Sequence, residues 1–411
     1  MKTSPVKGTN DYLPAEAALR EYMQNSILAT YTGNGFERIL TPALEDMENL
    51  DKSEGGDNLN LLFRILKRGD KLESALKEQK YGELSDIGLR YDLTVPLSRY
   101  FANNRQKLFM PFKCIQIDKA YRAERPQKGR EREFIQCDID ILGSNSTNCE
   151  IELIHVTAKA LLELGLKNFL VRVNDRRLLN ALLLGMGFEK NDIASVSITF
   201  DKLDKIGVDG VKEELAGKNF NAESIDKLTS LLNDMPITLK SVKNILGEEE
   251  SLASLEKIIA EVQRLSGGSY EIAFDISLVR GQGYYTGTVF EIESRDFERS
   301  IAGGGRYDNL IGKFTNEDIP AVGFSIGFEP IFCILKESGF EIPNKKKKIA
   351  VLYGGDIFEA DKIAEKFRGE YDVALHELPK KVGKYIDALE KAGYYGIFMC
   401  GKSESLEIFS N

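Results

Sequence analysis

The chain has 411 residues and a formal net charge of −9, with 55 Lys and Arg against 64 Asp and Glu. This length allows two or three domains with separate hydrophobic cores, and the acidic balance excludes a protein that attracts nucleic acid over its whole surface. Only two histidines are present and the five cysteines show no C-x-x-C spacing, which excludes a histidine-rich metal site and a histidine-based catalytic triad.

Apolar residues at helical spacing predict two helices in the first half of the chain. The first covers residues 16–31, and the second covers residues 150–166, with Asn148 or Thr147 as its cap. Between these helices, strand-like runs alternate with turns up to about residue 143. This part of the chain therefore combines helices with short strands.

The second half of the chain contains three further regions. Residues 178–262 are charged and rich in leucine with few strand signals, which predicts an inserted helical module. Strands resume over residues 270–301. After the run Lys345–Lys348, a strand at residues 349–353 and a helix around residues 361–368 begin a small α/β unit.

Residues 118–143 (DKAYRAERPQKGREREFIQCDIDILG) combine a basic arm, a turn and an alternating strand. Arginine suits phosphate because its planar fork binds phosphate oxygens in pairs. The period of two puts Gln136, Asp138 and Asp140 on one face, where they can accept hydrogen bonds. A ligand with both a phosphate and a hydrogen-bond donor would fit this hairpin, and an ordinary half-solvated edge strand is the alternative. The basic residues are Lys119, Arg122, Arg125, Lys128, Arg130 and Arg132.

A second unusual loop lies far downstream at residues 278–291, and a glycine triplet follows it at residues 303–305. The glycines near Arg280 let the backbone come close to a bound group. Tyr284 and Tyr285 offer flat faces with hydroxyl tips that suit a planar ring. A plain hairpin and a pair of core tyrosines would also explain these features, but packing does not readily explain Arg280.

With these loops, the chain resembles the histidine–tRNA ligases, which are class II aminoacyl-tRNA synthetases. The resemblance covers nearly the whole chain, and its segments follow the family's order. They are KGTNDYLP at 7–14, GFERILTPALE at 35–45, LRYDLTVP at 89–96, the basic hairpin at 118–143, the loops at 278–291 and 302–308, and AVGFSIGFEP at 321–330.

The resemblance implies an α+β fold. We expect a class II synthetase antiparallel sheet flanked by helices, with a helical insertion and a small C-terminal α/β domain. The expected boundaries are 1–177 and 263–342 for the two parts of the catalytic core, 178–262 for the helical insertion, 343–348 for a basic linker and 349–411 for a shortened anticodon-binding-like domain.

The resemblance also implies an activity. The protein would use ATP to convert L-histidine to histidyl-adenylate and would then transfer the histidine to tRNA(His). ATP would be a substrate, and Mg²⁺ would bind mainly through its phosphates rather than in a metal site of the protein. The turn at residues 126–129 would meet the acceptor end of the tRNA, and the segment at Thr41 and Pro42 would lie in a homodimer interface.

Four residues are implied in ATP binding and catalysis. Arg122 would contact the α-phosphate, and Glu124 would meet the adenine amino group. Arg130 would lie toward the β- and γ-phosphates. Arg280 would reach the α-phosphate and the substrate carboxylate from the opposite side. No side chain needs to act as a base, because a carboxylate is already nucleophilic.

A second set of residues is implied in histidine binding. The acceptors for the α-ammonium would be Asp92, Thr94 and Gln136, and the contacts to the imidazole would be Asp140, Tyr284 and Tyr285. A buried carboxylate that awaits an N–H rejects an apolar side chain strongly, because its own hydrogen-bond need would go unmet. Asp140 would therefore provide much of the selectivity for histidine.

Two departures from the family pattern support a second hypothesis. Pro330 stands where the third class II motif has an arginine, and we expect a short last domain because the chain ends soon after the predicted strand at residues 395–400. The alternative is a paralogue that does not charge tRNA, such as a histidine-binding regulatory subunit of ATP phosphoribosyltransferase. The presence of Arg122, Glu124 and Arg280 favours the active ligase.

The sequence predicts a cytoplasmic protein. No N-terminal apolar run suggests a signal peptide, and no stretch approaches the length of a membrane span. The cysteines are expected to be reduced core thiols. The lysine run Lys345–Lys348 is either a solvated linker or a patch that faces tRNA phosphates.

Overall fold

The computed structural model describes residues 1–409 except 54–59, 128, 201, 234–236, 248, 280–283 and 298. The chain forms two compact units, Met1–Gly339 and Phe340–Asn411. Each unit has a sheet of its own, so the two are described separately.

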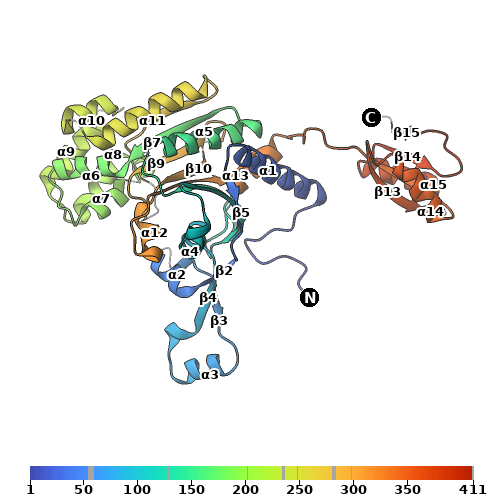
Figure 1. Ribbon diagram of the computed structural model, residues 1–411, viewed down its shortest axis with the longest axis horizontal. Coiled ribbons are helices and arrows are strands. Elements are labelled where there is room, and N and C mark those ends of the chain that lie inside the picture. The colour runs from blue at the N-terminus through green and yellow to red at the C-terminus, as the bar shows by residue number, and fades with distance from the viewer. Residues whose placement is uncertain are drawn as a thin grey trace. The chain divides into compact units, whose positions relative to one another are not determined.

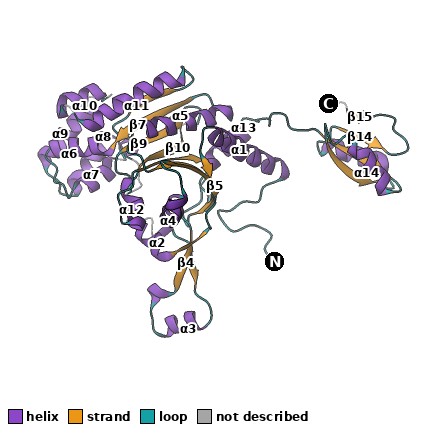
Figure 2. Cartoon of the chain, viewed as in Figure 1, coloured by secondary structure: helices purple, strands orange, loops and turns teal. Residues whose placement is uncertain are grey.

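Within the described residues, an eight-stranded sheet forms the base of the first unit (Figures 1 and 2). In spatial order, its strands are β1 (Glu37–Arg38), β5 (Phe112–Tyr121), β6 (Glu133–Leu142), β11 (Ala321–Gly327), β10 (Arg299–Arg306), β9 (Thr288–Ser294), β7 (Phe169–Asp175) and β8 (Glu271–Phe274). Neighbouring strands are antiparallel except at the two edges, where the pairs β1–β5 and β7–β8 are parallel. The strand that the alternating pattern predicted at residues 133–142 is β6, near the middle of the sheet.

Long helices cover one face of this sheet (Figure 1). They are α1 (Pro14–Gly33), α5 (Asn148–Glu163), α11 (Glu250–Ser266) and α13 (Phe328–Glu337). The two predicted helices are confirmed as α1 and α5, although Thr147 occupies the cap position of α5 without a side-chain cap hydrogen bond. The Tyr31 hydroxyl donates to Thr157 Oγ1 (3.2 Å) and joins α1 to α5 in the core.

Two further helices, α4 (Thr94–Asn104) and α12 (Asp308–Thr315), pack together beside the sheet. Their apolar side chains form a buried cluster with the ends of β5, β6 and β11. The members include Leu97, Phe101, Phe112, Leu142, Tyr307, Leu310, Ile311 and Ala321. This cluster fixes the start of α4 and the start of α12 next to the strands that form the site.

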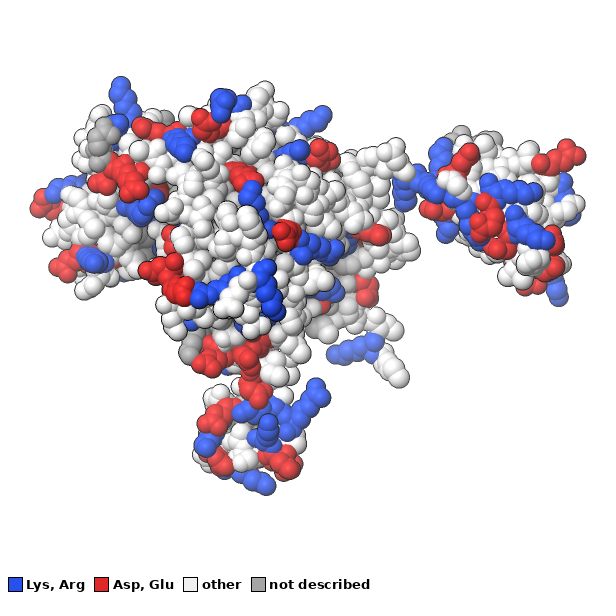
Figure 3. Space-filling model, in the orientation of Figure 1, with Lys and Arg blue, Asp and Glu red and all other residues white. Residues whose placement is uncertain are grey.

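The region predicted as an inserted helical module contains α6 (Arg176–Gly185), α7 (Ile193–Phe200), α8 (Leu203–Gly217), α9 (Ala222–Asn233) and α10 (Leu239–Leu246), and α11 follows them. A separate arm contains a small sheet in the order β2 (Leu44–Asp46), β4 (Ser85–Leu89), β3 (Arg64–Leu66), with α2 (Met47–Ser53) and α3 (Asp70–Lys77). On the face drawn in Figure 3, basic and acidic side chains are interspersed over this arm.

The second unit has a smaller sheet in the order β13 (Asp372–Glu377), β12 (Lys348–Tyr353), β14 (Gly396–Met399), β15 (Glu407–Ile408). Helices α14 (Ile357–Glu365) and α15 (Val382–Lys391) accompany it. The predicted strand at residues 349–353 is β12, whereas the helix predicted around 361–368 begins earlier, at Ile357, where the Asp356 carboxylate caps it. None of the helices in the described residues is long and apolar enough to cross a membrane.

Candidate active site

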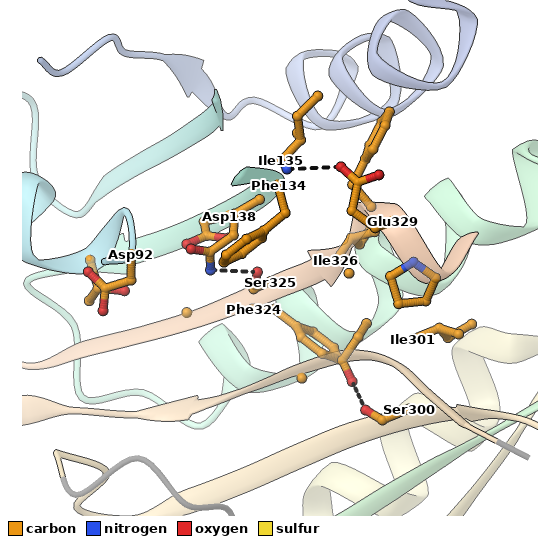
Figure 4. Close-up of a pocket in the computed structure, with 18 of the residues that line it drawn as sticks. Asp92, Phe134, Ile135, Asp138, Ser300, Ile301, Phe324, Ser325, Ile326 and Glu329 are labelled. Atoms are coloured by element: carbon orange, nitrogen blue, oxygen red, sulfur yellow. Dashed lines mark hydrogen bonds between the residues drawn. The ribbon is translucent and has the colours of Figure 1, made fainter. Parts of the chain in front are cut away.

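A cavity of about 270 Å³ lies over strands β6, β10 and β11. Strand β6 lines it with Gln136, Asp138 and Asp140, the three residues that alternation placed on one face. Asp92 reaches into the same cavity from the loop before α4 (Figure 4). Segments that are far apart in the sequence therefore meet around one pocket.

Four buried acceptor oxygens on residues that line this cavity have no hydrogen-bond partner among the described residues. They are Asp92 Oδ2, Gln136 Oε1, Asp138 Oδ1 and Asp140 Oδ2. A buried acceptor left unpaired costs about 1–3 kcal/mol, so a native protein rarely keeps several in one place without a use. The cluster indicates a ligand with several N–H or O–H donors and a positive charge.

Asp92 divides its two carboxyl oxygens between structure and site. Oδ1 accepts from the backbone N–H of Val95 in the first turn of α4 (3.1 Å), and Oδ2 has no hydrogen-bond partner among the described residues. The side chain is 2% exposed. Burial raises the pKa of Asp92, while the Val95 N–H and the Arg122 guanidinium act in the opposite direction.

Asp140 lies at the opposite end of this acidic row. Its Oδ1 accepts from the Tyr307 hydroxyl (2.5 Å), and it sits so close to Gly323 that a Cβ there would lie 2.0 Å from Oδ1. Burial raises the pKa of Asp140 to about 7, although the Tyr307 hydrogen bond lowers it. The carboxyl group is thus balanced between its neutral and charged forms, a frequent property of functional groups.

Aromatic rings form a wall beside Asp140. Tyr284 and Tyr285 have ring centroids 4.9 Å apart, and Tyr284 lies 5.9 Å from the ring of Tyr307. The glycine triplet permits this packing, because a Cβ on Gly305 would lie 2.9 Å from the Tyr285 ring. The pocket can therefore receive a flat ring whose edge meets a carboxylate.

A cation, Arg122, lies near these acids, where its charge acts to lower the pKa of Asp92 and of Asp138. The guanidinium carbon of Arg122 is 4.2 Å from the ring centroid of Tyr91 and 5.0 Å from that of Phe134, and its Nε donates to Tyr91 O (3.3 Å). In the described part of the chain, Nε is the only nitrogen of this group that makes a hydrogen bond. The two Nη groups can therefore bind a phosphate in the forked geometry typical of arginine.

The far end of the pocket contains a mixed group of charges. Arg130 Nη1 lies 3.5 Å from Glu124 Oε2, and Glu131 and Pro330 also line the cavity. Behind them, Arg20 of α1 makes a paired salt bridge to Glu329 (2.6 and 2.8 Å), whose Oε1 also accepts from the Ile135 N–H (3.2 Å; Figure 4). This buried pair fixes the start of α13, where Pro330 stands.

Comparison with known proteins assigns this arrangement to a family. Residues 8–331 match the profile of histidyl-tRNA synthetase. The histidine–tRNA ligase of Leifsonia xyli subsp. xyli is 43% identical over 348 residues, which are 81% of this chain and 80% of that protein. The chain belongs to the histidyl-tRNA synthetase family.

Further family members agree over the whole length. The histidine–tRNA ligase of Christiangramia forsetii is 33% identical over 98% of this chain and 93% of its own. The crystal structure of histidyl-tRNA synthetase from Nostoc sp. PCC 7120 superposes with a TM-score of 0.79 at 27% identity, covering 97% of this chain and 91% of that chain. The predicted class II synthetase fold is confirmed, and the non-charging paralogue is not favoured.

Nine of the ten residues that the sequence and the family resemblance singled out line the cavity. They are Asp92, Thr94, Arg122, Glu124, Arg130, Gln136, Asp140, Tyr284 and Tyr285. The tenth, Arg280, lies outside the described residues, as does Lys128 of the basic turn. The individual roles of all ten remain predictions.

The lining residues absent from the predicted site include Asp138, Tyr307 and Glu131. Asp138 was placed on the correct face of its strand but received no role, although alternation already grouped it with Gln136 and Asp140. Tyr307 and Glu131 lie inside segments that the sequence singled out, but neither received a role, because their contacts are with distant segments. Only packing reveals residues of this kind.

No group of three or more His, Cys, Asp or Glu side chains in the described ranges is arranged to hold a metal ion.

Proposed function

We propose that this protein is a histidine–tRNA ligase that activates L-histidine with ATP and transfers it to tRNA(His). The observation that supports this most directly is the row of unpaired acceptors opposite a stacked arginine. Histidine has an ammonium group and a ring N–H for the acceptors, and ATP has the phosphates for the arginine. The names of the close relatives support the same activity.

Activation is an attack of the histidine carboxylate on the α-phosphorus of ATP. An oxygen–phosphorus bond forms, and the bond from the α-phosphorus to the bridging oxygen breaks as diphosphate leaves. Negative charge builds on the phosphoryl oxygens, so positioning and electrostatic stabilisation provide most of the catalysis. Arg122 stabilises this charge from a guanidinium that Tyr91 and Phe134 hold in place. Arg280 would act from the other side.

ATP binds along the loop between β5 and β6. Arg130 and Glu124 form an ion pair, and we assign them to the terminal phosphates and to the adenine amino group, respectively. Mg²⁺ would enter with ATP and bind through its phosphate oxygens, and no step is assigned to it. ATP binding would therefore separate the Arg130–Glu124 pair.

Histidine recognition follows from the two ends of the acidic row. Asp92, Thr94 and Gln136 hold the α-ammonium, and Asp140 accepts the ring N–H while the tyrosine wall contacts the ring face. The Tyr307 hydroxyl orients the Asp140 carboxylate toward the substrate. An amino acid with an apolar side chain would leave Asp140 unpaired, so it would be rejected strongly.

We also propose a cytoplasmic homodimer. Leu40 and Leu44 are 67% and 52% exposed on either side of Thr41 and Pro42, beside edge strand β1, which is where an apolar contact between two copies would form. Light scattering at micromolar concentration should give twice the mass of the 46.1 kDa chain. A monomer under these conditions would contradict the dimer but not the activity.

Two assays test the proposed function. ATP–pyrophosphate exchange should depend on L-histidine and should be absent with phenylalanine, and tRNA bearing the histidine anticodon should then become charged. Exchange without charging would indicate a synthetase-like protein that only activates histidine. Absence of histidine-dependent exchange would refute the ligase.

A further inference from the structure

Asp138 is an acidic residue of the pocket that the proposed roles do not use. Asp138 lies on β6 between Gln136 and Asp140, is 5% exposed and lines the cavity. Its Oδ1 is one of the four acceptors without a partner in the described part of the chain. A carboxylate at such a buried position is expensive unless a ligand completes its hydrogen bonds.

The neighbours of Asp138 define what that ligand must provide. Asp138 pairs with Ser325 in the β6–β11 register, and the Ser325 side chain acts to lower the pKa of Asp138. Asp92 and Arg122 are close enough to interact electrostatically with it. In Figure 4, Asp138 is drawn between Asp92 and Ser325. Asp138 therefore lies between Gln136 and Asp140 on β6 and within electrostatic reach of Asp92.

We propose that Asp138 binds the α-ammonium of histidine together with Asp92, so that two carboxylates share one cation. This inference rests on the proposed function, since it requires histidine as the ligand. Residues Asp92, Gln136 and Asp138 each present one unpaired oxygen, and an ammonium group presents three N–H donors. Asp140 is then left for the ring N–H.

The electrostatics of the pocket agree with this assignment. Burial, and then the charge of Asp140, raise the pKa of Asp138 well above its ordinary range. A substrate ammonium beside the carboxyl group would act in the opposite direction and stabilise the ionised form. A bound ammonium would thus stabilise the ionised form of Asp138, whereas a carboxyl group with a purely structural role would gain nothing from the ligand.

The binding of three ligands can distinguish a contact between Asp138 and the ammonium group from a structural role of Asp138. Histidine and histidinol both have the ammonium and the ring, whereas 3-(imidazol-4-yl)propionate has the ring and the carboxylate without the ammonium. NMR titrations of the wild type and of Asp138→Asn would give dissociation constants for all three, including weak ones. Glu133→Gln is the matched control, because Glu133 is on the same strand, pairs with Lys119 (2.8 Å) and does not line the cavity.

We expect Asp138→Asn to weaken histidine and histidinol by about 10-fold or more, the loss typical of one charge-assisted hydrogen bond, and to leave the propionate unchanged. Glu133→Gln should change none of the three. Equal weakening of all three ligands would show that Asp138 only maintains the shape of the pocket. Unchanged binding of all three would also overturn the proposal. Failure of the wild type to bind histidine would instead refute the proposed function itself.

Discussion

Asp140 combines burial with incomplete hydrogen bonding. It is 3% exposed, keeps one oxygen on the Tyr307 hydroxyl and leaves the other unpaired among the described residues. A ligand that brings an N–H would supply the hydrogen bond that this second oxygen lacks. Stability and recognition therefore oppose each other at a single side chain.

Replacement of Asp140 by asparagine tests the role of this carboxylate in the recognition of histidine. The amide keeps the shape but loses the charge, so histidine-dependent pyrophosphate exchange should fall at least 10-fold, or about 1.4 kcal/mol. The Glu133→Gln variant, which also removes one carboxylate from β6, should retain its activity. Near-normal exchange by Asp140→Asn would rule out Asp140 as the acceptor for the imidazole.

The same variant tests how the Asp140 carboxyl group affects the stability of the folded protein. The pKa of Asp140 is raised to about 7 in the folded chain, and an unfolded aspartate has a pKa of about 3.9. Between these values the folded state binds more protons, so the wild type loses stability as pH rises through this window and regains none above it. Asp140→Asn should therefore be more stable than the wild type at pH 8, by on the order of 1–4 kcal/mol, with a smaller difference at pH 5. Urea unfolding without histidine at both pH values measures this, and a difference independent of pH would contradict it.

Gly323 permits Asp140 to occupy its place. A Cβ at Gly323 would lie 2.0 Å from Asp140 Oδ1, so Gly323→Ala must displace the carboxylate. We expect the KM for histidine to rise by about 10-fold or more, because a displaced acceptor loses its hydrogen bond. Gly33→Ala is the control, since no atom lies within 4 Å of a Cβ at that position. An unchanged KM in Gly323→Ala would show that Asp140 does not contact the substrate.

At the scale of elements, the pocket depends on how the start of α13 is held. Arg20 of α1 lies 4.0 Å from the ring centroid of Tyr12 and 4.8 Å from that of Phe328, and it makes the paired salt bridge to Glu329. The Glu329 carboxylate also accepts a hydrogen bond from the backbone N–H of Ile135 in β6. Three elements are thus joined by one buried pair, directly before Pro330. Proline fits this first turn of α13 because its missing N–H would have had no partner there.

Restoring a cation at Pro330 should improve ATP binding. Pro330 lines the cavity near the loop between β5 and β6, with its Cα 3.7 Å from where a Cβ on Gly129 would be. Pro330→Arg should lower the KM for ATP by about 5-fold or more, as expected of one additional charge-assisted contact to phosphate. Pro330→Ala tests the loss of the ring alone and should leave the KM near that of the wild type. Equal effects of the two substitutions would mean that the added charge does not reach ATP.

At the scale of the whole molecule, we expect the second unit to be dispensable for the activation of histidine. Every lining residue of the cavity belongs to the unit Met1–Gly339. The second unit has its own sheet and its own apolar clusters, which include Val351, Leu352, Leu389 and Ile397. Lys347 and Lys348 lie over the rings of Tyr395 and Tyr394, so part of the lysine run is packed against aromatic side chains.

A chain ending at Gly339 should therefore keep the first half-reaction. Histidine-dependent pyrophosphate exchange should stay within about 3-fold of the full chain, because compact units of this size fold with cores of their own. Charging of tRNA(His) should fall by about 10-fold or more, as expected if the lysine run Lys345–Lys348 faces tRNA phosphates. Circular dichroism would verify folding, and a folded truncated chain without exchange activity would show that the second unit supports the pocket.

The sequence by itself determined the local features of this protein. The period of two over residues 133–142 predicted the strand and the face that its acids share, and helical spacing located α1 and α5, because both signals repeat within a few residues. The family motifs then supplied most of the residues around the cavity. Helix ends were less accurate, as at α14, where the Asp356 cap sets the start.

The tertiary structure alone decided which distant groups meet. Tyr307 and Asp140 are 167 residues apart, and Arg20 and Glu329 are 309 apart, yet each pair forms a close hydrogen bond. No periodicity links such positions, since their contact depends on how the sheet and its helices pack as a whole. The unpaired oxygen of Asp138 became visible for the same reason, because only packing shows which polar atoms have found partners and which await a ligand.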